Sequence, residues 1–567
     1  MHLERLKIKS FRNLRDFKIN FTAGAKDADG VDRAFTSHAV IGQNGSGKSN
    51  LLEAIVTIFR DLDLNQKTAF EYELDYNCRG HFIRVNSEAG KVNVWDDNLA
   101  LTLGGDPEQN TSKTDPTEYA ISHLSRNARK YLPTHVFAYY SGKNDRIEAI
   151  FQQHQQKFYK ALLDGSDELL RRLFYCRSVH SQFVLLAYLL KEDPECKRIL
   201  SDLNVEELES VLFVLKRPYW FKRDLADEIL ASGDNRFWYA RGIVQEFLDK
   251  LWSKAIAPID HTEDRILDFR GRKEEHELLF LFIPDKAALS KLAEEIGDPA
   301  RFFKYLESTY ISDLIDEVRI NVKHRDVNGH ITFSQLSEGE QQLLTVLGLM
   351  RFTHEDESLF LLDEPDTHLN PIWKLRYFDE IEKVVKLRDA EAKSNSQLII
   401  TTHDPLMIGS LRKEQVRILK CEGGKATVST PDEHPQGMGV AGLLKSELFG
   451  LPSTLDSQTL KRLQERNELL ALKAKCQLSP DNEAKLKALR SQLDDLGFSR
   501  EYRDPLYQLF IEKMYAVRSQ PLDKLLTPAE KAAQEALAEK IVAKIVKTEK
   551  TEELSTLAQE LKIAVTK

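Results

Sequence analysis

The sequence predicts an α/β fold in which a mixed sheet carries a phosphate-binding loop, with a helical insertion and a helical C-terminal extension. Three observations predict it. An apolar segment at residues 39–41 leads into a glycine-rich loop and then an amphipathic helix. Two more apolar segments, residues 359–362 and 398–400, end in polar residues, as do strands buried on both faces of a parallel sheet. Helical periodicity fills much of the interval between the glycine-rich loop and these later segments, and it returns after about residue 440.

The glycine-rich loop has the pattern G-x-x-x-x-G-K-S of P-loop nucleotidases. Its glycines let successive backbone N–H groups surround phosphate oxygens, and the helix start adds positive potential. Lys48 would neutralise the terminal phosphates, and Ser49 would reach Mg²⁺. The alternative is a glycine-rich turn with no ligand. We expect ATP and Mg²⁺ to bind here, and the expected nucleotide contacts are Asn44, Gly45, Ser46, Gly47, Lys48, Ser49 and Asn50.

The apolar segment 359–362 ends in the adjacent carboxylates Asp363 and Glu364. The carboxyl ends of parallel strands are where such folds bind ligands. Asp363 is therefore predicted to hold Mg²⁺ together with Ser49. Glu364 is predicted to be the general base that orients the attacking water. Without the other motifs, this pair would be an ordinary exposed strand end.

Residues 333–342 place Ser337 before an acidic and then amphipathic stretch, which is typical of a helix N-cap. The order Leu-Ser-x-Gly-Glu-Gln at residues 336–341 resembles the signature motif of ABC-type ATPases. That resemblance implies that Ser337 and Gly339 contact the γ-phosphate held by the other subunit of a dimer, and that Glu340 joins them in completing that subunit's site. His403, which follows a strand, resembles the family's switch histidine, and residues 365–370 resemble its dimer-contacting loop.

The resemblance covers residues 1–160 and 265–430, and the motifs occur in the family's order. The insertion between them is far longer than in transporter subunits, and residues 3–13 resemble the opening strand of the SMC/RecF-like branch. The resemblance to this branch implies that Arg12 and Asn13 approach the nucleotide. The strand at residues 135–142 stands where the family has its Gln-containing loop, but it lacks the glutamine. Ser141 and Asn144 are the candidates to replace it.

The motifs divide the chain into an ATPase lobe (1–160), a helical insert (161–260), a second ATPase lobe (261–440) and a helical C-terminal region (441–567). Alternating segments in the first lobe predict an antiparallel layer beside the parallel core. The insert is expected to be a compact helical lobe, with residues 208–215 among its helices. No heptad pattern persists over many turns, so the long coiled-coil arms of SMC proteins are excluded.

The C-terminal region contains predicted helices at residues 460–477, 482–496 and 527–547, with an aromatic-rich segment at 497–510 between the last two. We interpret this region as a docking platform for a partner protein. A helical bundle packed on its own core is the alternative. In the insert, residues 216–223 mix cations with aromatics, which suits either nucleic acid or a helix end with solvated charges.

Composition restricts the class of protein. The chain has 567 residues, 42% of them hydrophobic, and a formal net charge of -9, which argues against a surface that coats nucleic acid everywhere. No apolar run is long enough to cross a bilayer, and no signal peptide is recognised, so we expect a cytoplasmic protein with no membrane association. The 5 cysteines have neither metal spacing nor a disulfide framework.

The overall plan resembles the Septu-type PtuA family of anti-phage ATPases, which are also found beside some retrons. This resemblance implies an ATPase that dimerises around ATP, as a homodimer or higher homo-oligomer, and regulates an HNH-type nuclease subunit. It also implies contact with nucleic acid, either DNA or retron msDNA. Two alternatives remain open, namely a RecF-like DNA-binding repair ATPase and the energy-coupling subunit of a transporter. The chain itself shows no nuclease centre.

Overall fold

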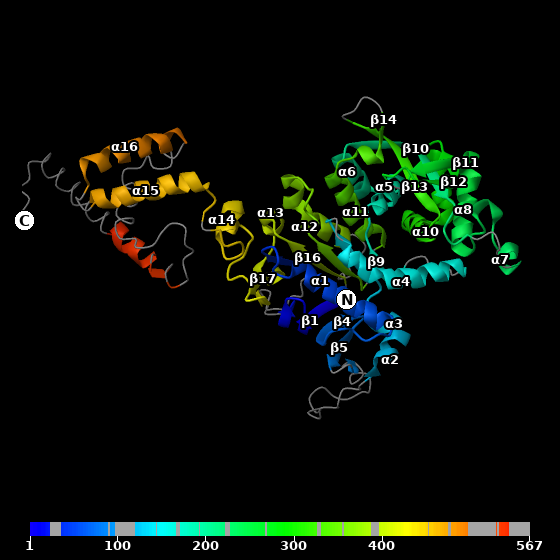
Figure 1. Cartoon of the computed structure of the whole chain (residues 1–567), viewed down its shortest axis with the longest axis horizontal. Coiled ribbons are helices and arrows are strands. Elements are labelled where there is room, and N and C mark those ends of the chain that lie inside the picture. Colours follow the sequence, from blue (N-terminus) through cyan, green and yellow to red (C-terminus); the bar gives the residue numbers. More distant parts are fainter. Residues whose placement is uncertain are drawn as a thin grey trace, which may run out of the picture. The chain divides into compact units, whose positions relative to one another are not determined.

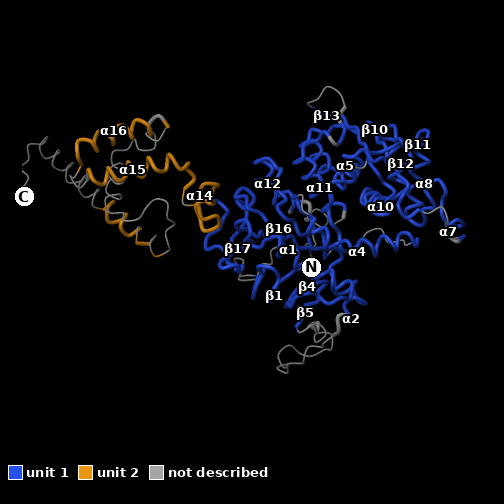
Figure 2. Tube along the Cα trace, in the orientation of Figure 1, with its two compact units in different colours: residues 1–438 blue, residues 439–567 orange. Residues whose placement is uncertain are grey.

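The computed structural model confirms the predicted mixed α/β fold. It describes residues 1–496 and 529–543, except for internal segments 23–35, 89–90, 97–118, 143–144, 166–170, 192, 222–226, 267–268, 326–329, 354–356, 387–395, 452, 475–477, 530–531 and 534. The chain forms two compact units, Met1–Met438 and Gly439–Lys567 (Figure 2). Each unit is described by itself.

A mixed sheet is the centre of the first unit (Figure 1). Its strand order is β18-β17-β3-β16-β15-β8-β9, and only the β17–β18 pair is antiparallel. β15 is buried throughout, as its uninterrupted apolar sequence predicts. The strands are β3 (Ser37–Gly42), β8 (Val136–Tyr140), β9 (Leu173–Tyr175), β15 (Leu359–Asp363), β16 (Gln397–Thr402), β17 (Val416–Glu422) and β18 (Lys425–Ser429).

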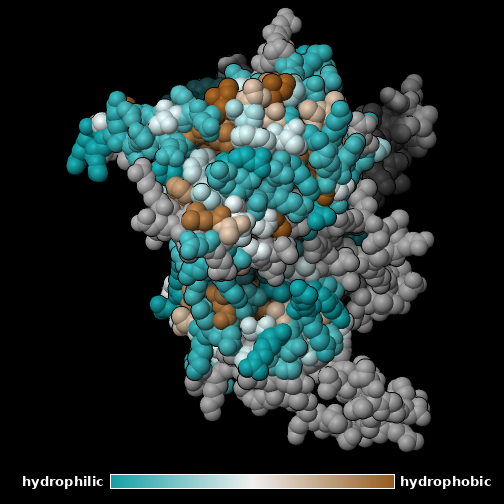
Figure 3. Space-filling view, turned by 90° about the vertical axis from the view of Figure 1, so that its right-hand side faces the viewer, coloured by the Kyte–Doolittle hydropathy of each residue, from teal (hydrophilic) through white to brown (hydrophobic). Residues whose placement is uncertain are grey.

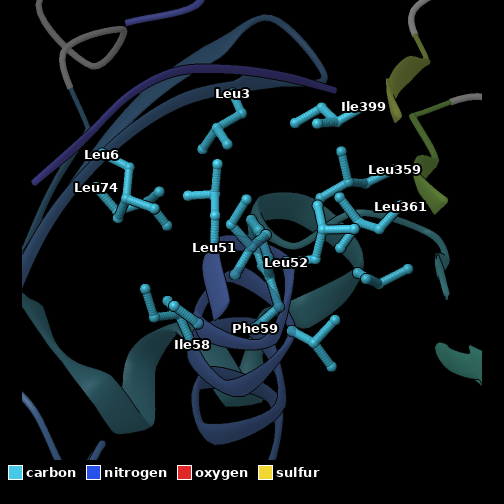
Figure 4. Close-up of a cluster of buried hydrophobic side chains, with 14 of the residues drawn as sticks. Leu3, Leu6, Leu51, Leu52, Ile58, Phe59, Leu74, Leu359, Leu361 and Ile399 are labelled. Carbon is cyan, nitrogen blue, oxygen red and sulfur yellow. The ribbon is translucent and has the colours of Figure 1, made fainter. Parts of the chain in front are cut away.

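An antiparallel sheet forms a second layer, as predicted. Its order is β2-β1-β4-β5-β6-β7. Helix α1 (Lys48–Asp63) packs between the two sheets: Leu51 and Leu52 lie among side chains from β1 and β4 on one side and from β15 and β16 on the other (Figure 4). The strands are β1 (His2–Phe11), β2 (Leu14–Asn20), β4 (Tyr72–Cys78), β5 (His81–Glu88), β6 (Lys91–Asp96) and β7 (Tyr119–Ala120).

The insert differs from the expected helical lobe, because it contains β10 and the start of β11. These strands belong to an antiparallel sheet of order β11-β12-β10-β13-β14, whose other strands lie after residue 260. Residues 208–215, expected to be helical, belong to β10 (Val205–Lys216), which pairs with β12 (Lys273–Ile283) and β13 (Ile315–His324). The edge strands are β11 (Ile256–Ile266) and β14 (His330–Thr332). The side of the molecule drawn in Figure 3 is mainly hydrophilic where it is coloured, with separate apolar patches.

The remaining helices of the first unit surround these sheets. α5 packs against both α10 and α11 and so joins the insert to the helix that begins at the signature motif. The α-helices are α2 (Ile121–Arg126), α3 (Ala128–Tyr131), α4 (Arg146–Leu163), α5 (Val179–Leu190), α6 (Pro194–Asp202), α7 (Asp227–Ser232), α8 (Gly242–Lys254), α9 (Lys286–Ile296), α10 (Pro299–Ile311), α11 (Glu338–Thr353), α12 (Pro371–Lys386) and α13 (Pro405–Ile408). Short 3₁₀ helices are η2 (Asn235–Phe237), η3 (Phe333–Gln335) and η4 (Lys413–Gln415).

The second unit is helical where it is described. It contains α14 (Gly439–Lys445), α15 (Ser457–Ala474) and α16 (Pro480–Asp495), and residues 535–543 are also helical. Leu469, Leu470, Leu486 and Leu489 form a small core between α15 and α16. The aromatic-rich segment 497–510, predicted to dock a partner, lies outside the described residues. Among the helices that are described, none is long and apolar enough to cross a membrane.

Candidate nucleotide-binding site

The phosphate loop connects β3 to α1, as the sequence predicts. Gly45 and Gly47 have φ angles of 81° and 110°, a region that side chains other than glycine rarely adopt. The Lys48 ammonium donates a hydrogen bond to the Gly42 carbonyl at 2.9 Å, and its side chain is only 5% exposed. The Ser46 hydroxyl oxygen is buried without a hydrogen-bond partner among the described residues. A lysine and a hydroxyl held in this way are available to phosphate oxygens.

Asp363 is fully buried at the end of β15. Its Oδ1 accepts a hydrogen bond from the Thr401 hydroxyl, while its Oδ2 is buried and has no partner within the described structure. Burial raises the pKa of Asp363, and the nearby hydroxyls of Thr401 and Ser49 only partly offset this. A buried carboxylate oxygen without a partner, beside a serine hydroxyl, fits a magnesium ion, which prefers hard oxygen ligands.

Glu364 lies between Lys48 and His403. Its Oε1 is 3.7 Å from the Lys48 Nζ and 3.2 Å from the His403 Nδ1. The Glu364 side chain is 27% exposed, in contrast to the buried carboxylate beside it. The backbone of Glu364 is left-handed, with φ at 49°, and its amide donates to the Thr401 carbonyl at 3.0 Å. This placement gives the carboxylate access to solvent next to a cation.

Arg12 and Asn50 form a network at the rim of the loop. The Arg12 guanidinium donates to Asn50 Oδ1 at 3.0 Å and pairs with Glu53 Oε2 at 2.6 Å. Asn13 receives a hydrogen bond from Asn50 at 2.7 Å and donates to the Gly45 carbonyl at 3.1 Å. Arg146, the first residue of α4, donates to Glu53 from the other side at 2.8 Å. The network fixes the start of α1 and the tip of the loop.

The residues of the signature motif are not hydrogen-bonded to the described residues of the phosphate loop. Ser337 and Glu340 form a capping box at the start of α11: the Ser337 hydroxyl donates to Glu340 Oε2 at 2.8 Å, and the Glu340 amide donates back at 3.3 Å. Ser337 is exposed, and its hydrogen bonds do not run to the phosphate loop. Gly339 packs closely on the next loop, because a Cβ there would lie 2.5 Å from the His368 carbonyl oxygen.

The structure therefore brings together Lys48, Ser49, Asp363, Glu364 and His403, places Arg12 and Asn50 beside them, and leaves the signature residues on a separate helix end. Of the two candidates for the missing glutamine, Asn144 lies outside the described residues. The Ser141 hydroxyl lies 2.8 Å from the Thr367 hydroxyl, so its partner is another side chain.

The sequence reasoning missed three residues near the site. Arg146 begins α4 and reaches the buried Glu53. Gln342, buried on α11, donates to the Pro365 carbonyl and accepts from the His368 amide at 3.3 Å. Thr367 donates to the Glu364 carbonyl at 2.9 Å. Of these three residues, only Thr367 could have been found from the sequence, because it lies in the loop that follows Asp363 and Glu364.

A family comparison agrees with this geometry. The family model described as "AAA ATPase domain" matches residues 1–408. The chain belongs to this AAA ATPase family. The match covers every strand of the mixed sheet through β16 and every residue of the candidate site, so the AAA ATPase domain accounts for the expected ATP binding and confirms the predicted ATPase identity.

Two curated relatives of this AAA ATPase are a Septu protein and a retron ATPase. The "Septu protein PtuA" of Bacillus mycoides (strain KBAB4) is 32% identical over 178 residues, which is 30% of this chain and 24% of that protein. The chain thus matches only about a quarter of PtuA. The "Retron Vc95 probable ATPase" of Vibrio cholerae serotype O1 biovar El Tor is 21% identical over 475 residues, which cover 78% of each chain. The predicted relationship to Septu and retron ATPases is therefore confirmed as a distant one.

Among solved structures, the "SMC head domain from Thermotoga maritima" aligns with 76% of this AAA ATPase chain and 99% of that chain. The identity is 13% and the TM-score is 0.29, which is too low to establish a common fold.

Proposed function

We propose that the chain hydrolyses ATP at a site that is completed by a second copy of the same chain. One observation carries the hydrolytic part of this proposal: Glu364, a partly exposed carboxylate, lies within 3.7 Å of the phosphate-loop lysine and within 3.2 Å of His403. A carboxylate in that position can orient and deprotonate a water molecule in line with a γ-phosphate.

The residues of one chain have separate roles in this reaction. The loop amides and Lys48 bind the phosphates and neutralise the charge that develops on them. Asp363 and Ser49 would hold Mg²⁺, which supplies positive charge to the phosphate oxygens when it is bound. Glu364 accepts the proton of the attacking water, and His403 keeps its carboxylate in place through the hydrogen bond at Nδ1.

The signature motif supports sharing of the site between two chains. Ser337 and Gly339 lie at a helix N-terminus, which carries partial positive charge, and Ser337 is exposed there. Because the hydrogen bonds of the Ser337 side chain in the described structure run to Glu340 and not to the phosphate loop, a second copy is its natural target. ATP would then favour the closed dimer by its higher affinity for that state, and hydrolysis would release it.

The Glu364→Gln variant tests this proposal. It should bind ATP with normal affinity, remain dimeric in ATP, and hydrolyse ATP at least about a hundredfold more slowly, since a general base contributes about that much or more. Lys48→Ala is the matched control and should lose ATP binding. Phosphate release, nucleotide affinity and sedimentation with and without ATP are the measurements. Hydrolysis by Glu364→Gln at the wild-type rate would refute the role given to Glu364.

Regulation of a partner nuclease in anti-phage defence is the cellular role that we propose. The distant similarity to the Septu protein PtuA and the retron ATPase supports it. An HNH-type nuclease is the expected partner, with the C-terminal unit as its docking region and DNA or msDNA as a further ligand. Affinity purification of the tagged chain from its native host tests this role: recovery of a nuclease supports it, whereas DNA-stimulated hydrolysis without any protein partner favours a repair ATPase.

A further inference from the structure

A chain of hydroxyl groups links the end of β8 to the backbone of Glu364. The Ser141 amide donates to the Asp363 carbonyl at 3.3 Å, and its hydroxyl lies 2.8 Å from the Thr367 hydroxyl. Thr367 in turn donates to the Glu364 carbonyl at 2.9 Å. Ser141 therefore contacts the segment of both carboxylate residues, although it directly follows β8 and lies more than two hundred residues earlier in the sequence than Thr367.

The direction of each hydrogen bond follows from counting protons. A hydroxyl has one proton to donate and two lone pairs to accept with. Thr367 uses its proton on the Glu364 carbonyl, which can only accept. In the hydrogen bond between the two hydroxyls, Ser141 must then be the donor and Thr367 the acceptor. The order is Ser141 to Thr367 to the Glu364 carbonyl, and each hydroxyl orients the next.

Glu364 needs such support because its backbone is strained. A φ of 49° is unfavourable for a residue with a Cβ and persists only where surrounding contacts fix it. The Glu364 amide is held by the Thr401 carbonyl, and the Glu364 carbonyl is held by Thr367. If the second contact were lost, the backbone could relax and the carboxylate would move away from Lys48 and His403.

We propose that Thr367 and Ser141 are positioning residues that keep Glu364 in its strained conformation, so that its carboxylate stays between Lys48 and His403. This inference rests on the proposed hydrolytic function and deepens it. Ser141 stands at the strand end that lacks the family's glutamine. In this inference it supports the backbone of Glu364 through Thr367.

Thr367→Val and Thr367→Ser form a matched pair for the test. Valine keeps the shape of threonine but has no hydroxyl, whereas serine keeps the hydroxyl, and the position is exposed, so neither change should impair folding. We expect Thr367→Val to lower kcat about tenfold, the effect of one lost hydrogen bond, with unchanged affinity for ATP. Thr367→Ser should restore kcat. Ser141→Ala should lower kcat by less, and the double variant Ser141→Ala/Thr367→Val should be no slower than Thr367→Val, because the two residues act in series.

Hydrogen exchange of the peptide that contains residues 363–370 gives a second measurement that does not depend on turnover. Exchange should be faster in Thr367→Val than in the wild type and normal in Thr367→Ser. Equal exchange and equal kcat in all three proteins would overturn the inference and leave the proposed hydrolysis intact. A wild-type chain that binds ATP without hydrolysing it would instead refute the proposed function, and exchange alone would then decide whether Thr367 holds this segment.

Discussion

Asp363 and Glu364 are neighbours in the sequence but have opposite surroundings. Asp363 ends a buried strand, and one of its oxygens has no partner in the described structure, whereas Glu364 turns out of the sheet with a left-handed backbone and faces Lys48 and His403. The sequence could predict this division, because consecutive residues at a strand end point in different directions. It could not predict the strain at Glu364, since the contacts that hold it come from Thr401 and Thr367.

His38 on β3 should make stability depend on pH. It is fully buried, its Nε2 donates to the Phe21 carbonyl at 2.8 Å, and burial lowers its pKa to about 3. Because the unfolded chain then binds a proton on this residue at higher pH than the folded chain, protonation favours unfolding. His38 therefore costs no stability above pH 6.5, and the free energy of unfolding should fall by about 1.4 kcal/mol per pH unit as the pH drops from 6.5 towards 3.

Urea unfolding at pH 7, 6, 5 and 4 tests this prediction with His38→Gln, whose side-chain amide can still donate to the Phe21 carbonyl. The variant should lose less stability than the wild type across this range. His261→Gln, at a half-exposed histidine, is the control and should follow the wild type. Parallel curves for His38→Gln and the wild type would show that His38 does not titrate on unfolding.

At the scale of elements, local signals predict the strand, loop and helix around the phosphate loop but not the sheet that β10 joins. The strand, loop and helix from β3 to α1 are contiguous, so periodicity and glycines suffice to find them. Leu208, Val211, Leu212 and Leu215 recur at helical spacing, which predicts a helix where the structure has β10. Its state is decided by hydrogen bonds to β12 and β13, which are remote in the sequence and leave no local signal.

The packing of α11 on α5 should depend on one glycine. A Cβ at Gly348 would lie 1.9 Å from the Cγ1 of Val184, closer than any real contact. Gly348→Ala should therefore lower the free energy of unfolding by about 1–3 kcal/mol, the usual cost of overpacking, although alanine is the better helix former. Since α11 begins at the signature motif, ATP hydrolysis should fall as well.

Chemical denaturation of Gly348→Ala, Val184→Ala and the double variant checks this explanation. Removing both Val184 methyl groups makes room for the new Cβ, so the double variant should be more stable than the sum of the single effects predicts. Strictly additive losses would mean that the contact between these two side chains is not the cause.

For the whole molecule, the motifs indicated an ATPase with a shared site, and family membership over residues 1–408 confirms the ATPase domain. Sequence patterns predicted which residues converge, because the carboxyl ends of β3, β15 and β16 meet at one edge of the sheet. They could not predict the rim formed by Arg146 and Glu53, which depends on where α4 starts relative to α1. Ser337 follows its motif, yet its hydrogen bonds among the described residues of one chain run to the adjacent helix turn.

Mixing two inactive variants tests most directly whether two chains share each site. Lys48→Ala lacks a working phosphate loop but has an intact signature, and Ser337→Arg has the reverse defect. In a mixed dimer, one site combines the intact loop of one chain with the intact signature of the other, so the mixture should hydrolyse ATP although neither variant does so alone. A mixture no more active than its separate components, or full activity of Ser337→Arg by itself, would contradict the account.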